Sequence, residues 1–132
     1  MKSFETVYNE LEELLIKKLP EYIEKINKEH NDGLILKPFE NTSLEENCIK
    51  QPSFKLTFTS GEYSEKDRII ENEIYNIQVE ILSFEKQQNE IITFWRYVEA
   101  LNKMFAEEET QYNYQIKELK ESTLKLQIQK FN

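Results

Sequence analysis

Four stretches of the chain alternate between apolar and polar residues, and this pattern restricts the possible folds more than any other feature of the sequence. Such alternation is typical of a β-strand that buries one face. Charged or polar connections join the first stretch to the second and the third to the fourth, so we expect two β-hairpins. Within the second stretch the alternation changes phase at Leu82, which predicts a β-bulge or a strand end there. The stretches are 53–59, 73–84, 112–116 and 124–128, with a turn at 120–122.

A long amphipathic helix is expected before the first hairpin. Apolar residues recur at steps of three and four from Phe4 to Ile26, which is typical of a helix with one buried stripe. Pro20 lacks an N–H group and disfavours helical geometry at the residue before it, so we expect a kink or two abutting helices there. The run Asn31-Asp32-Gly33 should close the second part.

A second helix is expected between the two hairpins. Its apolar stripe includes Trp95, which we therefore interpret as a core residue, whereas Phe94 and Tyr97 lie off the stripe. Acidic side chains at a helix C-terminus oppose the helix dipole, so the acidic run 107–109 should lie beyond the helix. The stripe consists of Ile91, Ile92, Trp95, Val98, Leu101, Met104 and Phe105.

The order of these elements, α-β-β-α-β-β, predicts an α+β fold in which two helices pack on one face of a mostly antiparallel sheet. A chain of 132 residues suits one domain, so we expect residues 1–132 to form a single unit. The segment 34–52 is polar and not periodic, and we interpret it as a connection with one short strand at 34–36.

The charged segment 60–72 predicts an extended arm on the first hairpin. It carries Tyr63, Arg68, Ile69 and Ile70. Two adjacent β-branched residues of an extended segment cannot both face the core, so one of the two isoleucines is a candidate for contact with a partner. Ordinary packing of the hairpin on its own sheet explains them equally well.

Composition argues against several classes of function. The chain has 17 Lys and Arg against 25 Asp and Glu, a net charge of −8, which disfavours specific or nonspecific binding of nucleic acid. With 2 glycines it can hardly build a loop whose backbone amides cradle a phosphate. It has no apolar run long enough to span a membrane, and the start Met1-Lys2-Ser3-Phe4-Glu5 is unlike a secretory signal, so we expect a soluble intracellular protein.

No group of residues predicts an enzyme, a metal site or a cofactor. His30 is the sole imidazole, and near a helix C-terminus it is best interpreted as a solvated residue. Cys48, the sole thiol, excludes an intramolecular disulfide and a cysteine zinc site, and we interpret it as a structural thiol. The tripeptide Glu118-Leu119-Lys120 is found in metal-dependent nucleases, but it is common, and no upstream aspartate completes such a site.

The strand-arm-strand signature resembles a known family. LTFTSGEY at 56–63 and YNIQVEIL at 75–82 flank the arm, and YQIKEL and TLKLQIQ follow in the second hairpin. Together with the two helices, this pattern is similar to the tail-terminator, or tail-completion, proteins of long-tailed bacteriophages and their prophage relatives. The resemblance implies a structural protein without catalytic activity or cofactor, which forms a ring, usually hexameric.

The same resemblance implies the partners and the location of the protein. The ring would contact the tail tube and the head connector, and the protein would reside in the bacterial cytoplasm during assembly and then in the virion tail. Family members commonly use the arm and the sheet edges for subunit contacts. Here these contacts would fall on Tyr63, Arg68, Ile69, Ile70, Tyr112 and Tyr114.

Two other functions stay open at this point. A small acidic inhibitor, of the immunity or anti-restriction type, would use the same negative charge to mask a basic partner. A metal-dependent hydrolase is the more distant alternative. For a ring around DNA, acidic residues facing the channel would let the phosphate backbone slide without binding.

Overall fold

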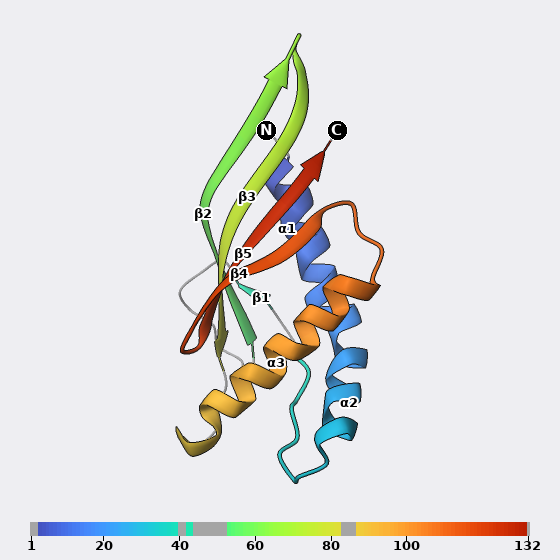
Figure 1. Ribbon diagram of the computed structural model, residues 1–132, viewed down its shortest axis with the longest axis vertical. Coiled ribbons are helices and arrows are strands. Elements are labelled where there is room, and N and C mark those ends of the chain that lie inside the picture. Colours follow the sequence, from blue (N-terminus) through green and yellow to red (C-terminus); the bar gives the residue numbers. More distant parts are fainter. Residues whose placement is uncertain (1–2, 40–41, 44–52, 83–86, 132) are drawn as a thin grey trace.

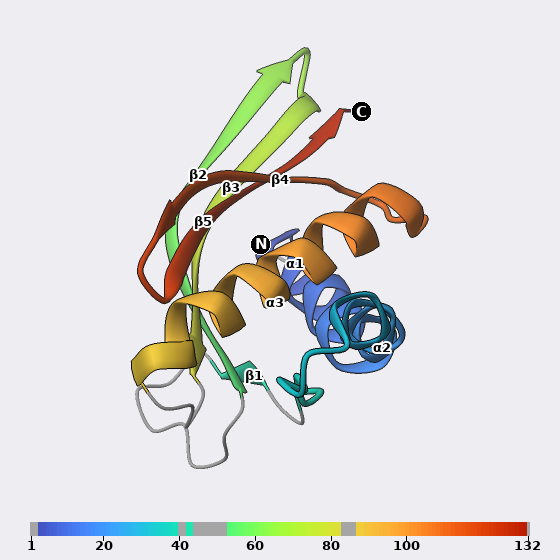
Figure 2. The same ribbon diagram turned by 60° about the horizontal axis from the view of Figure 1, so that its bottom comes forward.

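The computed structural model describes residues 3–39, 42–43, 53–82 and 87–131 (Figure 1). Its sheet has five strands in the order β1-β2-β3-β5-β4, and all neighbouring strands are antiparallel except β1 and β2. The helices lie on one face of this sheet (Figure 2), so the predicted α+β fold is confirmed. The elements are α1 (Ser3–Glu13), the π-helical turn η1 (Leu14–Lys18), α2 (Leu19–His30), β1 (Thr42–Ser43), β2 (Ser53–Lys66), β3 (Ile69–Leu82), α3 (Gln87–Glu107), β4 (Asn113–Lys120) and β5 (Thr123–Phe131).

The first helix continues without a break from Ser3 to His30, and its wide turn lies where a kink was predicted (Figure 1); we refer to this helix as the rod. The π-helical turn η1 lies just before Pro20, which occupies the first turn of α2, where its missing N–H is harmless. The spacing of the buried residues explains the wide turn. The buried residues Val7, Leu11, Leu15 and Leu19 are four residues apart. In a regular α-helix, each step of four residues rotates the side-chain direction around the axis by about 40°. One extra residue in a π turn cancels most of this drift and keeps all four side chains on the buried face.

Residues 31–39 leave the rod as irregular chain. Asn31 caps α2 in the left-handed conformation, with φ of 39°, and its N–H donates to the carbonyl of Asn27, so the predicted helix end is confirmed. The strand predicted at 34–36 is wrong, because the side chain of Asn27, instead of another strand, bonds both the N–H and the carbonyl of Leu36. The rest of the predicted connection, including Cys48, lies outside the described residues.

The first hairpin is longer than the alternation predicts. β2 and β3 each have 14 residues and pair almost continuously, so most of the predicted arm is a two-stranded ribbon that ends in a tight turn at Asp67 and Arg68. The alternation stops at Thr59 because this residue is an extra one in the pairing, between Phe58 and Ser60, and shifts the phase of the strand. The last residue of β3 is Leu82, where a bulge or strand end is predicted, and residues 83–86 lie outside the described ranges.

The second hairpin places β4 at the edge of the sheet. β5 lies between β3 and β4, and the turn at Glu121 and Ser122 joins the two tail strands as predicted. Lys117 is an extra residue in β4, because Ile116 pairs with Leu126 whereas Glu118 pairs with Lys125. This bulge brings Leu119 to the helix side of the sheet, on the same face as Ile116.

The core lies between the helices and the inner face of the sheet. Its strand residues alternate as predicted, and the side chains on the opposite face are mostly polar. The buried apolar residues of the sheet are Phe54, Leu56, Tyr75, Ile77, Val79, Ile81, Leu124, Leu126 and Ile128.

The N-terminal part of α3 buries a different side from the predicted one, whereas Val98, Leu101 and Met104 of the predicted stripe are buried. Trp95 is 61% exposed, and Ile91 and Ile92 also lie at the surface. Phe94 and Tyr97, which fall outside the predicted stripe, are buried. The assignment of Trp95 to the core is therefore wrong. Both sides of this part of the helix are apolar, so periodicity alone could not select the inner one.

The C-terminus of α3 also differs from the prediction. The helix runs to Glu107, and the N–H of Glu108 still donates to the carbonyl of Met104, so the acidic run is not wholly outside the helix. Contacts with the rod compensate for the unfavourable helix dipole. The hydroxyl of Tyr22 donates to Glu108 at 2.8 Å, and Lys25 lies 3.8 Å from Glu107.

Candidate functional site

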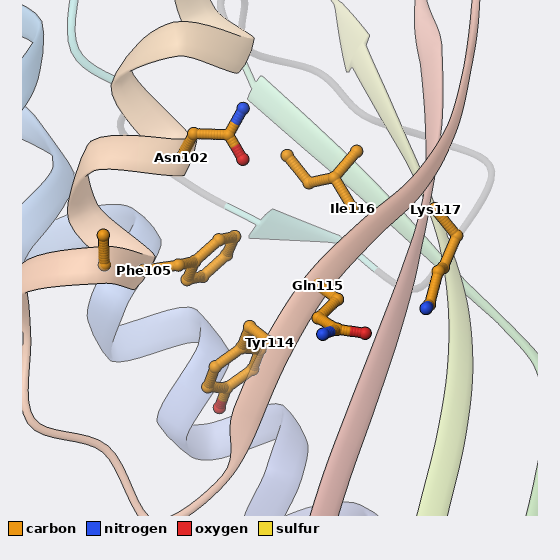
Figure 3. A pocket seen from close by; sticks show the side chains of 7 residues that line it. Asn102, Phe105, Tyr114, Gln115, Ile116 and Lys117 are labelled. Atoms are coloured by element: carbon orange, nitrogen blue, oxygen red, sulfur yellow. The ribbon is translucent and has the colours of Figure 1, made fainter.

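Two hollows lie along the boundary between α3 and the edge strand β4. The first, of about 440 Å³, lies beside the C-terminal half of α3. Figure 3 shows Asn102 and Phe105 projecting from α3 towards Ile116 and Tyr114 of β4, whereas Lys117 points away from the helix. The rings of Phe105 and Tyr114 stack, with centroids 4.9 Å apart, and this contact joins the helix to the strand.

The second hollow is more apolar than the first. It is a hollow of about 520 Å³ between the N-terminal half of α3 and the turn that joins β4 to β5. Trp95, Ile91 and Leu119 line it, and they are 61%, 55% and 48% exposed. Glu90, Lys120 and Glu121 stand among the lining residues. We refer to the two hollows together as the α3–β4 groove.

Glu10 fixes the start of β4 relative to the rod. Its carboxylate accepts the backbone N–H of Gln111 at 2.9 Å and of Tyr112 at 3.3 Å, and the hydroxyl of Tyr114 at 2.6 Å. Burial, followed by this hydrogen bond to a carboxylate, raises the pKa of Tyr114 well above its ordinary value, so the phenol stays protonated as a donor. One acidic side chain of α1 thus orients the strand that forms one wall of the groove.

Arg96 and Tyr97 fix the other side of α3. Arg96 is 8% exposed, and its guanidinium donates to both carboxylate oxygens of Asp32 and to the carbonyl of Leu34. The hydroxyl of Tyr97 donates to the carbonyl of Lys37 at 2.7 Å. These bonds hold residues 32–37 against the inner side of α3, and they explain why Trp95, on the opposite side of the helix, faces outward.

The charge on Arg96 is fully compensated. Its hydrogen bonds, together with the N–H of Leu34, hold the pKa of Asp32 well below its usual range. The bonded carboxylate of Asp32 raises the pKa of Arg96. This ion pair is bidentate, and we assign it to the anchoring of α3.

The structure places the six residues predicted at subunit contacts in different environments. Tyr112 is 3% exposed and packs on Tyr75, so it has almost no surface left for another subunit. Tyr114 is half-buried and lines the α3–β4 groove. Arg68 is exposed at the ribbon turn, where φ is 67°. Tyr63, Ile69 and Ile70 lie on the ribbon, and their side chains are outside the described residues.

The candidate catalytic residues do not converge. His30 is exposed at the end of α2, and its Nε2 lies 3.3 Å from the carboxylate of Glu99. Glu118 pairs with Lys125 at 3.3 Å across the strands, which occupies the carboxylate of the nuclease-like tripeptide. Within the described ranges, no three histidine, cysteine or acidic residues are grouped as a metal site would require.

Sequence reasoning missed the groove because its walls come from distant parts of the chain. Periodicity placed Trp95 in the core, and no local signal predicts that Glu10 contacts residues about a hundred positions later. One signal was present. Apolar residues occur on both sides of α3 near Trp95, which indicates that one side faces something other than the core.

Two edges of the sheet have no neighbouring strand among the described residues. No described strand lies beyond β4. On the other side, β1 pairs with Phe54 and Lys55, and no other strand of the described ranges lies along the outer edge of β2. The end of the β2–β3 ribbon also extends past β5, whose last pairing is with Asn72 (Figure 1). Uncovered edges carry free backbone N–H and carbonyl groups that can pair with another strand.

The negative charge is concentrated on the helical layer. The described segments 3–30 and 87–109 contain 12 acidic and 6 basic residues, whereas the strands and turns of 53–82 and 113–131 contain 8 acidic and 7 basic residues. Several acids of the helical layer form ion pairs within it, such as Glu29 with Lys103 at 2.7 Å. The sheet thus offers a nearly neutral polar surface, and the helices an acidic one.

Comparisons with known proteins do not assign the chain to a family. Neither the protein-family models nor the curated proteins compared with this sequence give a match. Among the described residues, no helix is both long enough and apolar enough to cross a membrane. The function is therefore inferred from the groove, the two sheet edges and the distribution of charge.

Proposed function

We propose that the protein is a structural subunit that associates with copies of itself, as its resemblance to phage tail-terminator proteins implies. The observation that supports this most directly is the open sheet, which has on each side an edge that no further strand of the described residues covers. An apolar groove with an exposed tryptophan runs beside one of them. Monomeric proteins rarely leave an uncovered strand edge and an apolar hollow side by side at their surface.

The positions of the two edges suit a head-to-tail arrangement. When the edge of one subunit pairs with the opposite edge of the next, the interface is heterologous, and it closes into a ring if the rotation between subunits permits. The extended β2–β3 ribbon suits such an exchange because it reaches beyond its own sheet (Figure 1). A ring of this kind would act at the end of a phage or prophage tail, between the tail tube and the head connector.

Oligomeric state is the first test. We expect sedimentation to show concentration-dependent growth of the purified protein from monomer to a single larger species. Purified tail tubes, if added, should bind the protein at their ends. A protein that stays monomeric at millimolar concentration and does not bind tube ends would contradict the proposal.

A second candidate function is a small acidic inhibitor that masks a basic partner. The excess of acidic residues on the helical layer favours it, since complementary charge speeds and directs association. The two candidates use different surfaces. Reversal of exposed helical acids, for example Glu21→Lys with Glu24→Lys, would weaken an inhibitor complex but leave association through the sheet edges intact.

A further inference from the structure

We infer that the α3–β4 groove binds the β2–β3 ribbon of a second copy of this chain, with Trp95 as the apolar anchor. This inference rests on the proposed self-association and identifies the two surfaces that meet. The ribbon is defined here as residues 60–72, and its outer edge is the β2 part, Ser60 to Lys66.

The groove has the geometry of a site for strand addition. An extended segment that binds an edge strand forms backbone hydrogen bonds with it, and every second side chain then enters the groove beside that strand. In this chain the edge strand is β4, and the adjoining hollow is lined by Trp95, Ile91 and Leu119. Tryptophan is enriched among the residues that dominate binding energy at interfaces, particularly where it can be fully covered.

The bulge in β4 makes the apolar anchor necessary. Lys117 interrupts the strand, so an added segment can pair regularly only with residues 113–116 or 118–120. Few backbone hydrogen bonds are then available, and an arbitrary strand would bind weakly. A partner must also cover Trp95 and match the side chains around it, which restricts binding to a specific segment.

The ribbon of a second copy fits this requirement in length and availability. Ser60 to Lys66 is a run of seven strand residues without an extra residue of its own, and no described strand covers its outer edge. β4 has eight residues, which the bulge at Lys117 divides into runs of four and three, so part of the ribbon is long enough to pair with either run. Because the ribbon and β4 lie on opposite sides of the sheet, one subunit can give its ribbon to one neighbour and receive the ribbon of another.

The charges on the two edges are complementary. β2 carries Glu62 and Glu65 three residues apart, and β4 carries Lys117 and Lys120 with the same spacing. All four side chains are exposed, and none takes part in the ion pairs found between described residues. Antiparallel addition with Glu62 opposite Lys120 places two opposite charges across the strands, and such a cross-strand pair favours that register.

Trp95 provides a direct measurement, because it is the single tryptophan of the chain. In the free subunit it is mostly exposed, so its fluorescence should have a long emission maximum. We expect this maximum to shift to shorter wavelength at the concentrations at which sedimentation shows association. The variant Trp95→Ser should fold, since most of the side chain is exposed, but it should associate at least about tenfold more weakly.

Charge reversal tests which segment enters the groove. Lys120→Glu and Glu62→Lys should each weaken association about tenfold, and a protein that carries both should recover most of the affinity. Lys17→Glu, which reverses an exposed charge on the rod, is the matched control and should leave association unchanged. Circular dichroism would confirm that all four variants remain folded.

The outcomes separate this inference from the proposed function. Association with an unchanged Trp95 emission, and with no rescue in the double charge variant, would overturn the groove as the binding site while self-association stands. A protein that remains monomeric at millimolar concentration would overturn both.

Discussion

Replacement of Glu10 by alanine should destabilise the protein because it removes the acceptor shared by three donors. Gln111 is exposed, so its N–H can bond to water instead. Tyr112 is 3% exposed and Tyr114 is half-buried, so their N–H and O–H would lose their partner without full hydration. At about 1 to 3 kcal/mol for each unsatisfied buried donor, we expect Glu10→Ala to lower the free energy of unfolding by roughly 2 to 4 kcal/mol.

Urea unfolding followed by circular dichroism would measure this loss, with two reference variants. Glu10→Gln keeps one acceptor oxygen and should lose about half as much. Glu13→Ala removes an exposed acid of the same helix and should change the stability by no more than about 0.5 kcal/mol. The double variant of Glu10→Ala with Tyr114→Phe should cost less than the sum of the two single changes, because they remove the same hydrogen bond. Equal stability of Glu10→Ala and Glu13→Ala would refute the reasoning and show that water replaces the carboxylate.

Three further predictions concern other parts of the chain. Trp95→Ala should lower the free energy of unfolding by only about 1 kcal/mol, whereas Tyr97→Ala should lower it by about 3 to 5 kcal/mol, and equal losses in urea would contradict the orientation of α3. Arg96 holds the pKa of Asp32 below its ordinary value near 4, so the stability from this pair is present above about pH 4 and is lost as the pH falls further. In Asp32→Asn, the free energy of unfolding measured from pH 6 to pH 2 should therefore fall less steeply towards low pH. Arg68→Gly should raise the melting temperature, since Arg68 has a φ of 67° at the ribbon turn, and the gain should be up to about 1 kcal/mol.

The sequence predicts the fold class and most strand positions because alternation reports directly which side chains are buried. It fails where the backbone departs from a regular repeat. The extra residue Thr59 shifts the phase of β2, so the continuation of this strand looks like a charged loop although it is paired with β3. The wide turn at Leu14–Lys18 has a similar cause, since it preserves a four-residue spacing that a regular helix cannot keep on one face.

The groove could be predicted only in part. Its floor depends on the rotation of α3, and that rotation is set by the bonds from Arg96 to Asp32 and from Tyr97 to Lys37. These partners are about 60 residues apart in the chain, and polar contacts of this kind leave no periodic signal. The edge position of β4 likewise follows from the insertion of β5 between it and β3, which the order of the strands in the sequence does not reveal.

The π-helical turn has a consequence for the length of the chain. A π turn adds one residue to an α-helix. The side chains after the turn point in the directions that they would have in a regular helix without that residue. Deletion of a single residue between Leu14 and Lys18 should therefore yield an uninterrupted α-helix in which Ile23 and Ile26 still face the core. A deletion of the same size inside α2 would instead turn every later residue by about 100°. The five residues of this turn are thus a segment of the rod in which one residue can be deleted without a change in the architecture of the protein.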